Sequence, residues 1–139
     1  MKYKIVAKYI KDLKFNIPNT KTFFLLSKNI SNYKVNIDIR SNQIKKDIVE
    51  VETSLSLNSQ NGDFEKITTQ IIHATIIELE GEQTTKEILE KIILIEIPKK
   101  IYSEIREIFV DLFEKSGFKD IKIDKEVDFE KLYNQRRVQ

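Results

Sequence analysis

The sequence predicts an α+β fold: a four-stranded antiparallel sheet followed by two helices, one long and one short at the C-terminal end. First, apolar and polar side chains alternate through four segments of the first 80 residues, which is the period of a strand. Second, the spacing becomes helical in the rest of the chain. Third, strands and helices do not alternate, so parallel βαβ units are not expected. A length of 139 residues suits a single domain, residues 1–139.

The four predicted strands cover residues 3–17, 33–40, 47–58 and 64–79. The first strand ends at Pro18, which has no N–H to donate to a neighbouring strand. Its apolar face is formed by Ile5, Ala7, Tyr9, Leu13, Phe15 and Ile17, with Lys11 as an exception. Between the third and fourth strands, Asn61-Gly62 is a strong hairpin signal. The strands therefore form a meander or a Greek key with one buried face.

Residues 20–32, between the first two strands, are expected to form an irregular connection. This segment is unusually apolar for a loop, because it contains Phe23, Phe24, Leu25 and Leu26. The pattern favours a plug on the core over the alternative, an exposed binding element.

Helical signals follow the fourth strand. Thr84 and Glu87 have the spacing of a capping box, which predicts a short helix or a helical crossover. Pro98 opens a longer helix that ends at Gly117, since proline suits a first helical turn and glycine suits the end. Asp128 is a candidate N-cap for the short last helix.

Composition argues against several function classes. The net charge is +2 and four of the 24 basic residues are Arg, the residue that best matches phosphates and guanine edges, so no nucleic-acid partner is expected. None of the three glycines lies in a phosphate-binding loop, and the chain has no Cys. His73 is the single His and is expected at a surface or an edge. We therefore expect no enzymatic activity, no catalytic residue, no cofactor and no metal site.

We expect a protein of the cytoplasm, with which the hydropathy of the chain is compatible. No apolar run approaches the roughly 20 residues of a membrane span, so no integral membrane contact is expected. Lys interrupts the N-terminal segment at short intervals, which leaves no apolar region of a secretory signal.

The segment YIKDLKFNIPN resembles the start of the SecB family, the bacterial chaperones of protein export. The family also opens with a Tyr, then Lys-Asp, then alternating apolar residues that end at Pro-Asn or Pro-Ser. VNIDI and DIVEVETSLSL resemble its second and third strands, IPKKIYSEIREIF its long helix, and GFKDIKIDKEVDFEKLY its C-terminal segment. The resemblance covers nearly the whole chain. It implies a SecB-like fold, a homotetramer built as a dimer of dimers, and a chaperone activity that needs no nucleotide.

The resemblance further implies a chaperone that binds non-native precursor polypeptides and delivers them to the SecA motor ATPase. Clients of the family bind in apolar grooves. The matching residues here are Phe23, Phe24, Tyr33, Val35, Ile37 and Ile39. In the family, SecA docks a basic, zinc-bearing tail on an acidic sheet surface. Asp12 keeps one of those acids, whereas Asn16 and Gln70 stand where two more are usual, which implies a weakened SecA contact.

Two alternatives are compatible with the same residues. A SecB-like chaperone can be dedicated to one partner, such as an antitoxin, and a weakened acidic surface fits that task. A small-ligand-binding or enzymatic α+β domain would instead need a deep, closed pocket with converging polar groups. An open groove along the surface would favour a chaperone.

Overall fold

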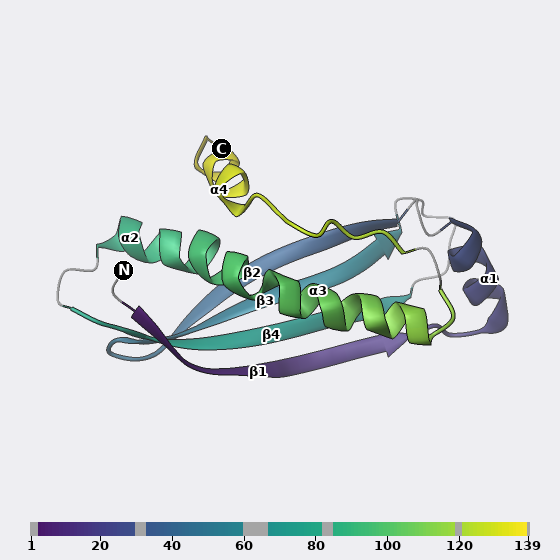
Figure 1. The fold of residues 1–139 in the computed structure, drawn as a ribbon, viewed down its shortest axis with the longest axis horizontal. Coiled ribbons are helices and arrows are strands. Elements are labelled where there is room, and N and C mark those ends of the chain that lie inside the picture. Colours follow the sequence, from purple (N-terminus) through teal and green to yellow (C-terminus); the bar gives the residue numbers. More distant parts are fainter. Residues whose placement is uncertain (1–2, 30–32, 60–66, 82–84, 119–120, 139) are drawn as a thin grey trace.

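The computed structural model describes residues 3–29, 33–59, 67–81, 85–118 and 121–138. Its sheet consists of β1 (Tyr3–Asn16), β2 (Tyr33–Lys45), β3 (Ile48–Ser59) and β4 (Thr68–Leu79). Neighbouring strands are antiparallel, in the order β1-β4-β3-β2 (Figure 1). This is a Greek-key order, because β2, β3 and β4 are consecutive neighbours and β1 lies beside β4. The predicted fold class is confirmed, while the Asn61-Gly62 hairpin lies outside the described residues.

β1 departs from the predicted alternation because it contains two bulges, at Val6 and at Lys11. A bulge inserts one extra residue, so the side chains that follow it change face. The prediction that Ala7 and Tyr9 share the apolar face with Ile5 is therefore wrong, since both lie on the opposite face of the sheet. β1 is also largely exposed rather than half-buried, because the described chain places a neighbouring strand on one side of it only.

The segment after β1 is a helix, α1 (Thr20–Asn29), so the prediction of an irregular connection is wrong. The side chain of Asn19 accepts a hydrogen bond from the N–H of Thr22 at 2.8 Å and so caps the helix. The Pro-Asn pair that ends β1 is thus also a helix start. Both interpretations of the segment hold in part, because Leu26 is fully buried whereas Phe24 is 65% exposed.

A helix runs from residue 86 to residue 115 in three consecutive parts. These are α2 (Lys86–Lys91), the π-helical turn η2 (Ile92–Glu96) and α3 (Ile97–Lys115). The helix that was predicted to begin at Pro98 is therefore continuous with α2 and η2. A proline inside a helix lacks the N–H for its own hydrogen bond, and the wider turn of η2 just before it accommodates this.

The helix ends carry recognisable capping residues. Thr85 caps α2 by accepting a backbone N–H at 3.2 Å, and the predicted cap, Thr84, lies outside the described residues. Asp128 caps α4 (Phe129–Val138) as predicted, by accepting a backbone N–H at 2.9 Å. Gly117 follows the end of α3 with a φ of 100°, a left-handed conformation that glycine adopts without a steric penalty.

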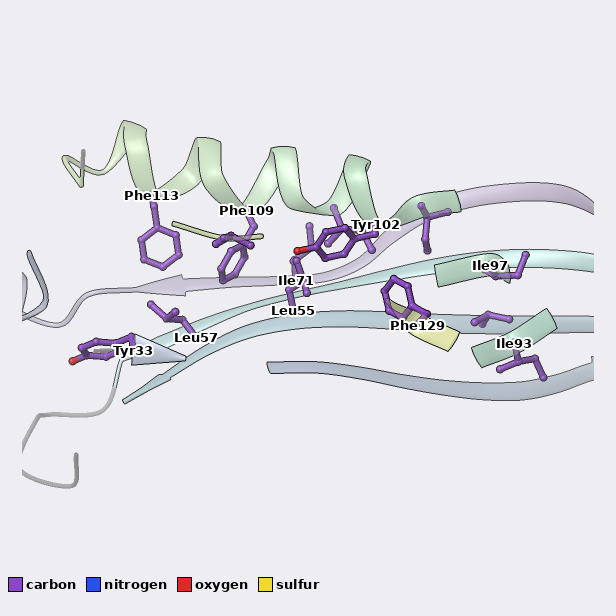
Figure 2. Packing of buried hydrophobic residues seen from close by; sticks show 14 of the residues in the cluster. Tyr33, Leu55, Leu57, Ile71, Ile93, Ile97, Tyr102, Phe109, Phe113 and Phe129 are labelled. Carbon is purple, nitrogen blue, oxygen red and sulfur yellow. The ribbon is translucent and has the colours of Figure 1, made fainter. Parts of the chain in front are cut away.

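The core is the layer between α3 and one face of the sheet, and Figure 2 shows the side chains of Phe109 and Phe113 pointing from the helix toward the strands. Phe113 makes edge contacts with Phe15 and Phe109 at ring-centroid distances of 5.0 and 5.2 Å. The largest fully buried side chains are Leu26, Val51, Leu55, Ile71, Ile77, Ile92, Ile97, Ile101, Ile105, Phe109, Phe113 and Phe118.

The segment after α3 returns along that helix and places α4 near α2 and β2 (Figure 1). The hydroxyl of Tyr102 donates to the carbonyl of Asp124 at 2.6 Å, and Nε of Arg106 donates to the carbonyl of Ile123 at 3.0 Å. These two bonds fix the return path, and with it the position of α4. Within the described ranges, no helix is long and apolar enough to cross a membrane.

Candidate functional site

An open hollow of about 300 Å³ lies between β2, η2 and α4. It is lined by Ile37, Asp38, Ile39, Leu94, Phe129, Leu132, Tyr133 and Gln135. Five of these eight residues are aliphatic or Phe, and they come from three segments that are distant in the sequence. In the described part of the chain, β2 has a neighbouring strand on one side only, so the hollow borders a free edge of the sheet. A hollow with apolar side chains beside a free strand edge can bind an extended polypeptide.

The four β2 residues predicted for the client groove share one face of that strand. Val35, Ile37 and Ile39 are paired in register with Leu57, Leu55 and Thr53 of β3, whose side chains lie on the buried face. All three are half-buried and pack against the core. Tyr33 is buried at the beginning of β2. The structure thus brings Ile37 and Ile39 into the hollow, whereas Tyr33 and Val35 lie farther along the strand.

The two predicted aromatic residues of α1 lie elsewhere. α1 sits beyond the end of the sheet at which β2 begins, away from α4 (Figure 1). Phe23 packs on Phe118 at a ring-centroid distance of 4.8 Å and meets the edge of Phe24 at 5.6 Å. Phe24 is the most exposed of the large apolar side chains of the described residues. Phe23 and Phe24 therefore form an aromatic site of their own at this end of the sheet.

The η2 and α4 residues of the hollow were missed by sequence analysis. Phe129, Leu132 and Tyr133 have the i, i+3, i+4 spacing of one helix face, which was a readable signal. Leu132 is 46% exposed although it belongs to this face. The hydroxyl of Tyr133 donates to a carboxylate oxygen of Glu90 at 3.4 Å, a contact that joins α4 to α2.

The three residues predicted for SecA docking lie on the open face, defined here as the face of the sheet opposite α3. Asp12 is paired in register with Ile72, Gln70 with Lys14, and Asn16 with a threonine of β4. The register therefore places all three on the same side of the β1–β4 pair. A shallow hollow of about 230 Å³ on this face is lined by Asp38, Arg40, Glu52, Ser54, Gln70 and Ile72.

The open face also carries a hydrogen-bonded network of charged residues that the sequence did not predict. Tyr9 donates its hydroxyl hydrogen bond to Glu50, and Nζ of Lys11 lies 3.1 Å from a carboxylate oxygen of Glu50 and 3.0 Å from one of Glu52. The hydrogen bond from Tyr9, and after it Lys11, holds the pKa of Glu50 below its usual value against the opposing effect of burial. The one available signal was Lys11 itself, the polar exception on the predicted apolar face.

His73, the single histidine of the sequence, lies in the core. His73 was expected at a surface or an edge, but it is 5% exposed and lies on the face of β4 that α3 covers, so that expectation is wrong. Burial lowers the pKa of His73, which favours the neutral form at pH 7. Among the described residues, no three His, Cys, Asp or Glu side chains gather closely enough to hold a metal ion.

Comparison with known proteins agrees with this geometry. The family model described as preprotein translocase subunit SecB matches residues 1–139. A putative protein-export protein SecB of Pelagibacter ubique is 39% identical, over 96% of this chain and 96% of its own. A protein-export protein SecB of Gluconobacter oxydans is 26% identical, over 100% of this chain and 84% of its own. Among solved structures, a SecB-like chaperone of Mycobacterium tuberculosis in complex with an antitoxin peptide matches with a TM-score of 0.67 at 17% identity, covering 91% of this chain and 88% of that one. The chain belongs to the SecB family.

Proposed function

We propose that the chain, as one domain over residues 1–139, is a cytoplasmic chaperone that binds non-native precursor proteins and delivers them to the SecA motor for export. Family membership supports the chaperone class. The observation that carries the proposal is the hollow of about 300 Å³ beside the free edge of β2, to which five aliphatic or Phe side chains contribute.

The hollow suits unfolded polypeptide because it is open beside a strand and combines aliphatic and aromatic side chains with polar groups. An unfolded precursor exposes apolar side chains at irregular spacing, and a surface of this kind accepts them without reading a sequence. A strand edge adds backbone hydrogen bonds that every extended chain can make. The proposed client path runs from the hollow along β2 to α1. Its predicted residues are Ile37, Ile39, Val35, Tyr33, Phe24 and Phe23.

We further propose that the protein works as a homotetramer, a dimer of dimers. Apolar side chains on the edge strand β1 are exposed in the single chain. They are Ile5, Val6, Tyr9, Ile10 and Leu13, each between 36 and 52% exposed. An edge strand with unpaired backbone groups and apolar side chains is a template for another chain. Because these side chains are already about half buried, covering the rest of each would contribute roughly 0.5–1.5 kcal/mol, which favours burial against a second copy.

We propose that the open face is the side that meets SecA, through Asp12, Asn16 and Gln70. Their shared position on the β1–β4 pair supports a common contact. The charge of this face is largely neutralised within the chain, since Asp12 lies 3.6 Å from Lys14 and Asp38 lies 3.1 Å from Arg40. A basic tail therefore gains little from long-range attraction, and SecA contact is expected to be weak and sensitive to salt.

The test of client binding uses the exposed lining residue Leu132. Leu132→Ala removes apolar contact from the hollow, and Ile88→Ala is the matched control, because Ile88 is also 46% exposed but lies on α2 outside the lining. The measurement is the affinity for a slow-folding, non-native client and the delay of its refolding. Leu132→Ala removes three methylene-sized groups, but because Leu132 is already about half buried, a client can cover only the remaining half, worth about 1 kcal/mol. This predicts about 3- to 10-fold weaker binding for Leu132→Ala and no change for Ile88→Ala.

The two variants distinguish the possible results. Equal weakening in both would indicate non-specific apolar binding, and unchanged binding in both would reject the hollow as the client site. Mass spectrometry of clients co-purified from native lysate separates a general chaperone from a dedicated one. Many precursors are expected, whereas a single recurring partner would contradict the general export role.

A further inference from the structure

Lys11 occupies an unusual position on the open face. It is the extra residue of the second β1 bulge, and its ammonium group reaches past β4 to two carboxylates of β3. Two strand spacings are about 9–10 Å, which is a long reach for a lysine. Register explains how it succeeds: Ala74 of β4 lies between Tyr9 and Glu52, so the strand that must be crossed carries a methyl group at this level.

The bulge is what brings Lys11 to this face. In an unbroken strand, Lys11 and Asp12 would point to opposite sides of the sheet. Here Asp12 lies on the open face by register, and Lys11 lies there by its contacts with Glu50 and Glu52. Re-aiming a side chain is a common effect of a bulge. The one residue that the bulge inserts therefore neutralises a pair of carboxylates.

This network is held more firmly than the other charge pairs of the face. The side chains of Glu50 and Glu52 are 8 and 17% exposed, whereas those of Asp12 and Asp38 are 42 and 57% exposed. A Lys or Arg of an incoming peptide can replace the basic partner of an exposed, solvent-screened carboxylate at little cost in free energy. At Glu50 it would have to displace both Lys11 and the hydroxyl of Tyr9.

We propose that Lys11 determines the partner selectivity of the open face: by neutralising Glu50 and Glu52, it lowers the affinity of this face for basic polypeptide. The partner class is a positively charged, extended peptide. Its identification with the SecA tail rests on the proposed function, whereas the role of Lys11 follows from the contacts. Removing the ammonium group exposes two adjacent carboxylates in the middle of the sheet and creates a stronger site for basic peptide.

The experiment compares Lys11→Gln with Lys4→Gln. Lys4 lies on the same strand and, by its register with Glu78, on the same face, and it makes no ion pair with a described residue. Both variants lose one positive charge, but only Lys11→Gln releases carboxylates. The probes are octalysine and a zinc-loaded SecA tail peptide, titrated at low and high ionic strength. Lys11→Gln is expected to bind octalysine about 3- to 10-fold more tightly at low ionic strength, with less than about a 2-fold change for Lys4→Gln.

Two further variants keep the test sharp. Lys11→Arg preserves the charge and is expected to bind like the wild type. Glu52→Gln, a variant of a partly accessible side chain, removes a carboxylate that Lys11 already neutralises, so it is expected to weaken octalysine binding less than about 2-fold. A larger loss would overturn the proposal even if Lys11→Gln does not fold. Equal affinities of Lys11→Gln and Lys4→Gln would also overturn it, because net charge alone would then explain the effect.

The two probes separate this inference from the proposed handover. Tighter octalysine binding by Lys11→Gln without any tail binding supports the role of Lys11 and rejects SecA docking on this face. Tail binding by the wild type, together with an octalysine affinity that is equal in the wild type and in Lys11→Gln, supports docking and rejects the role of Lys11. Client holding is expected to be unchanged in both variants, because neither Lys11 nor Lys4 lines the client hollow.

Discussion

Replacing Gly117 by alanine tests how α1 is held against the end of α3. Gly117 has a φ of 100°, and a Cβ at this position would lie 3.2 and 3.3 Å from two ring carbons of Phe23. Phe23 is not free to retreat, because its ring packs on Phe118 at 4.8 Å. The substitution therefore strains the backbone of Gly117 and also pushes on the aromatic site of α1.

The expected cost has two parts. A left-handed conformation costs alanine about 1–2 kcal/mol, because its Cβ approaches the following carbonyl oxygen. Moving the ring of Phe23 by a few tenths of an ångström adds about 1 kcal/mol, the low end of the cost of overpacking. The free energy of unfolding is thus expected to fall by about 2–3 kcal/mol, which corresponds to a Tm lower by about 6–12 °C for a chain of this size.

The assay is urea unfolding followed by circular dichroism, at one fixed protein concentration. Gly81→Ala is the control, because Gly81 has a φ of 95° and is exposed, so it reports the backbone part of the cost. Adding Phe23→Ala to Gly117→Ala is expected to remove the contact part. The double-mutant cycle should give a coupling energy of about 1 kcal/mol.

Two results would refute this reasoning. If Gly117→Ala costs no more than Gly81→Ala, the ring of Phe23 does not lie against residue 117. If Phe23→Ala leaves the cost of Gly117→Ala unchanged, the strain belongs to the backbone alone. In either case α1 would not be positioned by the end of α3.

Three further predictions address assembly, acid stability and docking. Light scattering is expected to give a tetramer mass at micromolar concentration, and Leu13→Lys on the exposed edge of β1 is expected to lower it; a monomeric wild type would contradict the assembly proposal. The folded pKa of Glu50 is depressed, so its stabilising contribution is present above the unfolded pKa and is lost as pH falls through the folded pKa. Glu50→Gln should therefore flatten the loss of stability at low pH, as measured by urea midpoints at pH 7 and in acid, and an unchanged acid slope would show that another group dominates. Asp12→Lys is expected to lower the affinity for a zinc-loaded SecA tail peptide by a few-fold at low salt, as measured by titration. An affinity equal to that of the wild type would exclude Asp12 from the contact.

Much of the fold could be predicted because its signals are local. The alternation that defines β2, β3 and β4 needs only the period-two geometry of a strand, and those strands were found with shifted ends. The Asp128 cap needs only the residues of one helical turn. α1 was missed because the capping signal of Asn19 coincides with the end of a strand, and the strand was the stronger pattern.

The candidate site could be predicted only where one strand carries it. Ile37 and Ile39 were identified because residues two apart share a strand face. Leu94 and Leu132 join them from η2 and α4, and nothing in the local sequence says that these two segments meet beside β2. Phe23 and Phe24 were expected to border the same face, but the end of α3 positions α1 apart from the hollow.

The sequence by itself determined the fold class, the family, most helix and strand positions and the buried stripe of α3, because each depends on short-range periodicity or on motifs read in order. The tertiary structure decided which face each β1 side chain occupies, since that depends on two bulges that become visible only through pairing with β4. It also decided that Lys11 meets Glu50 and Glu52, a contact between residues about 40 positions apart that requires the strand between them to carry Ala74. Long-range register is set by the packing of the whole sheet, and a single strand's pattern does not contain it.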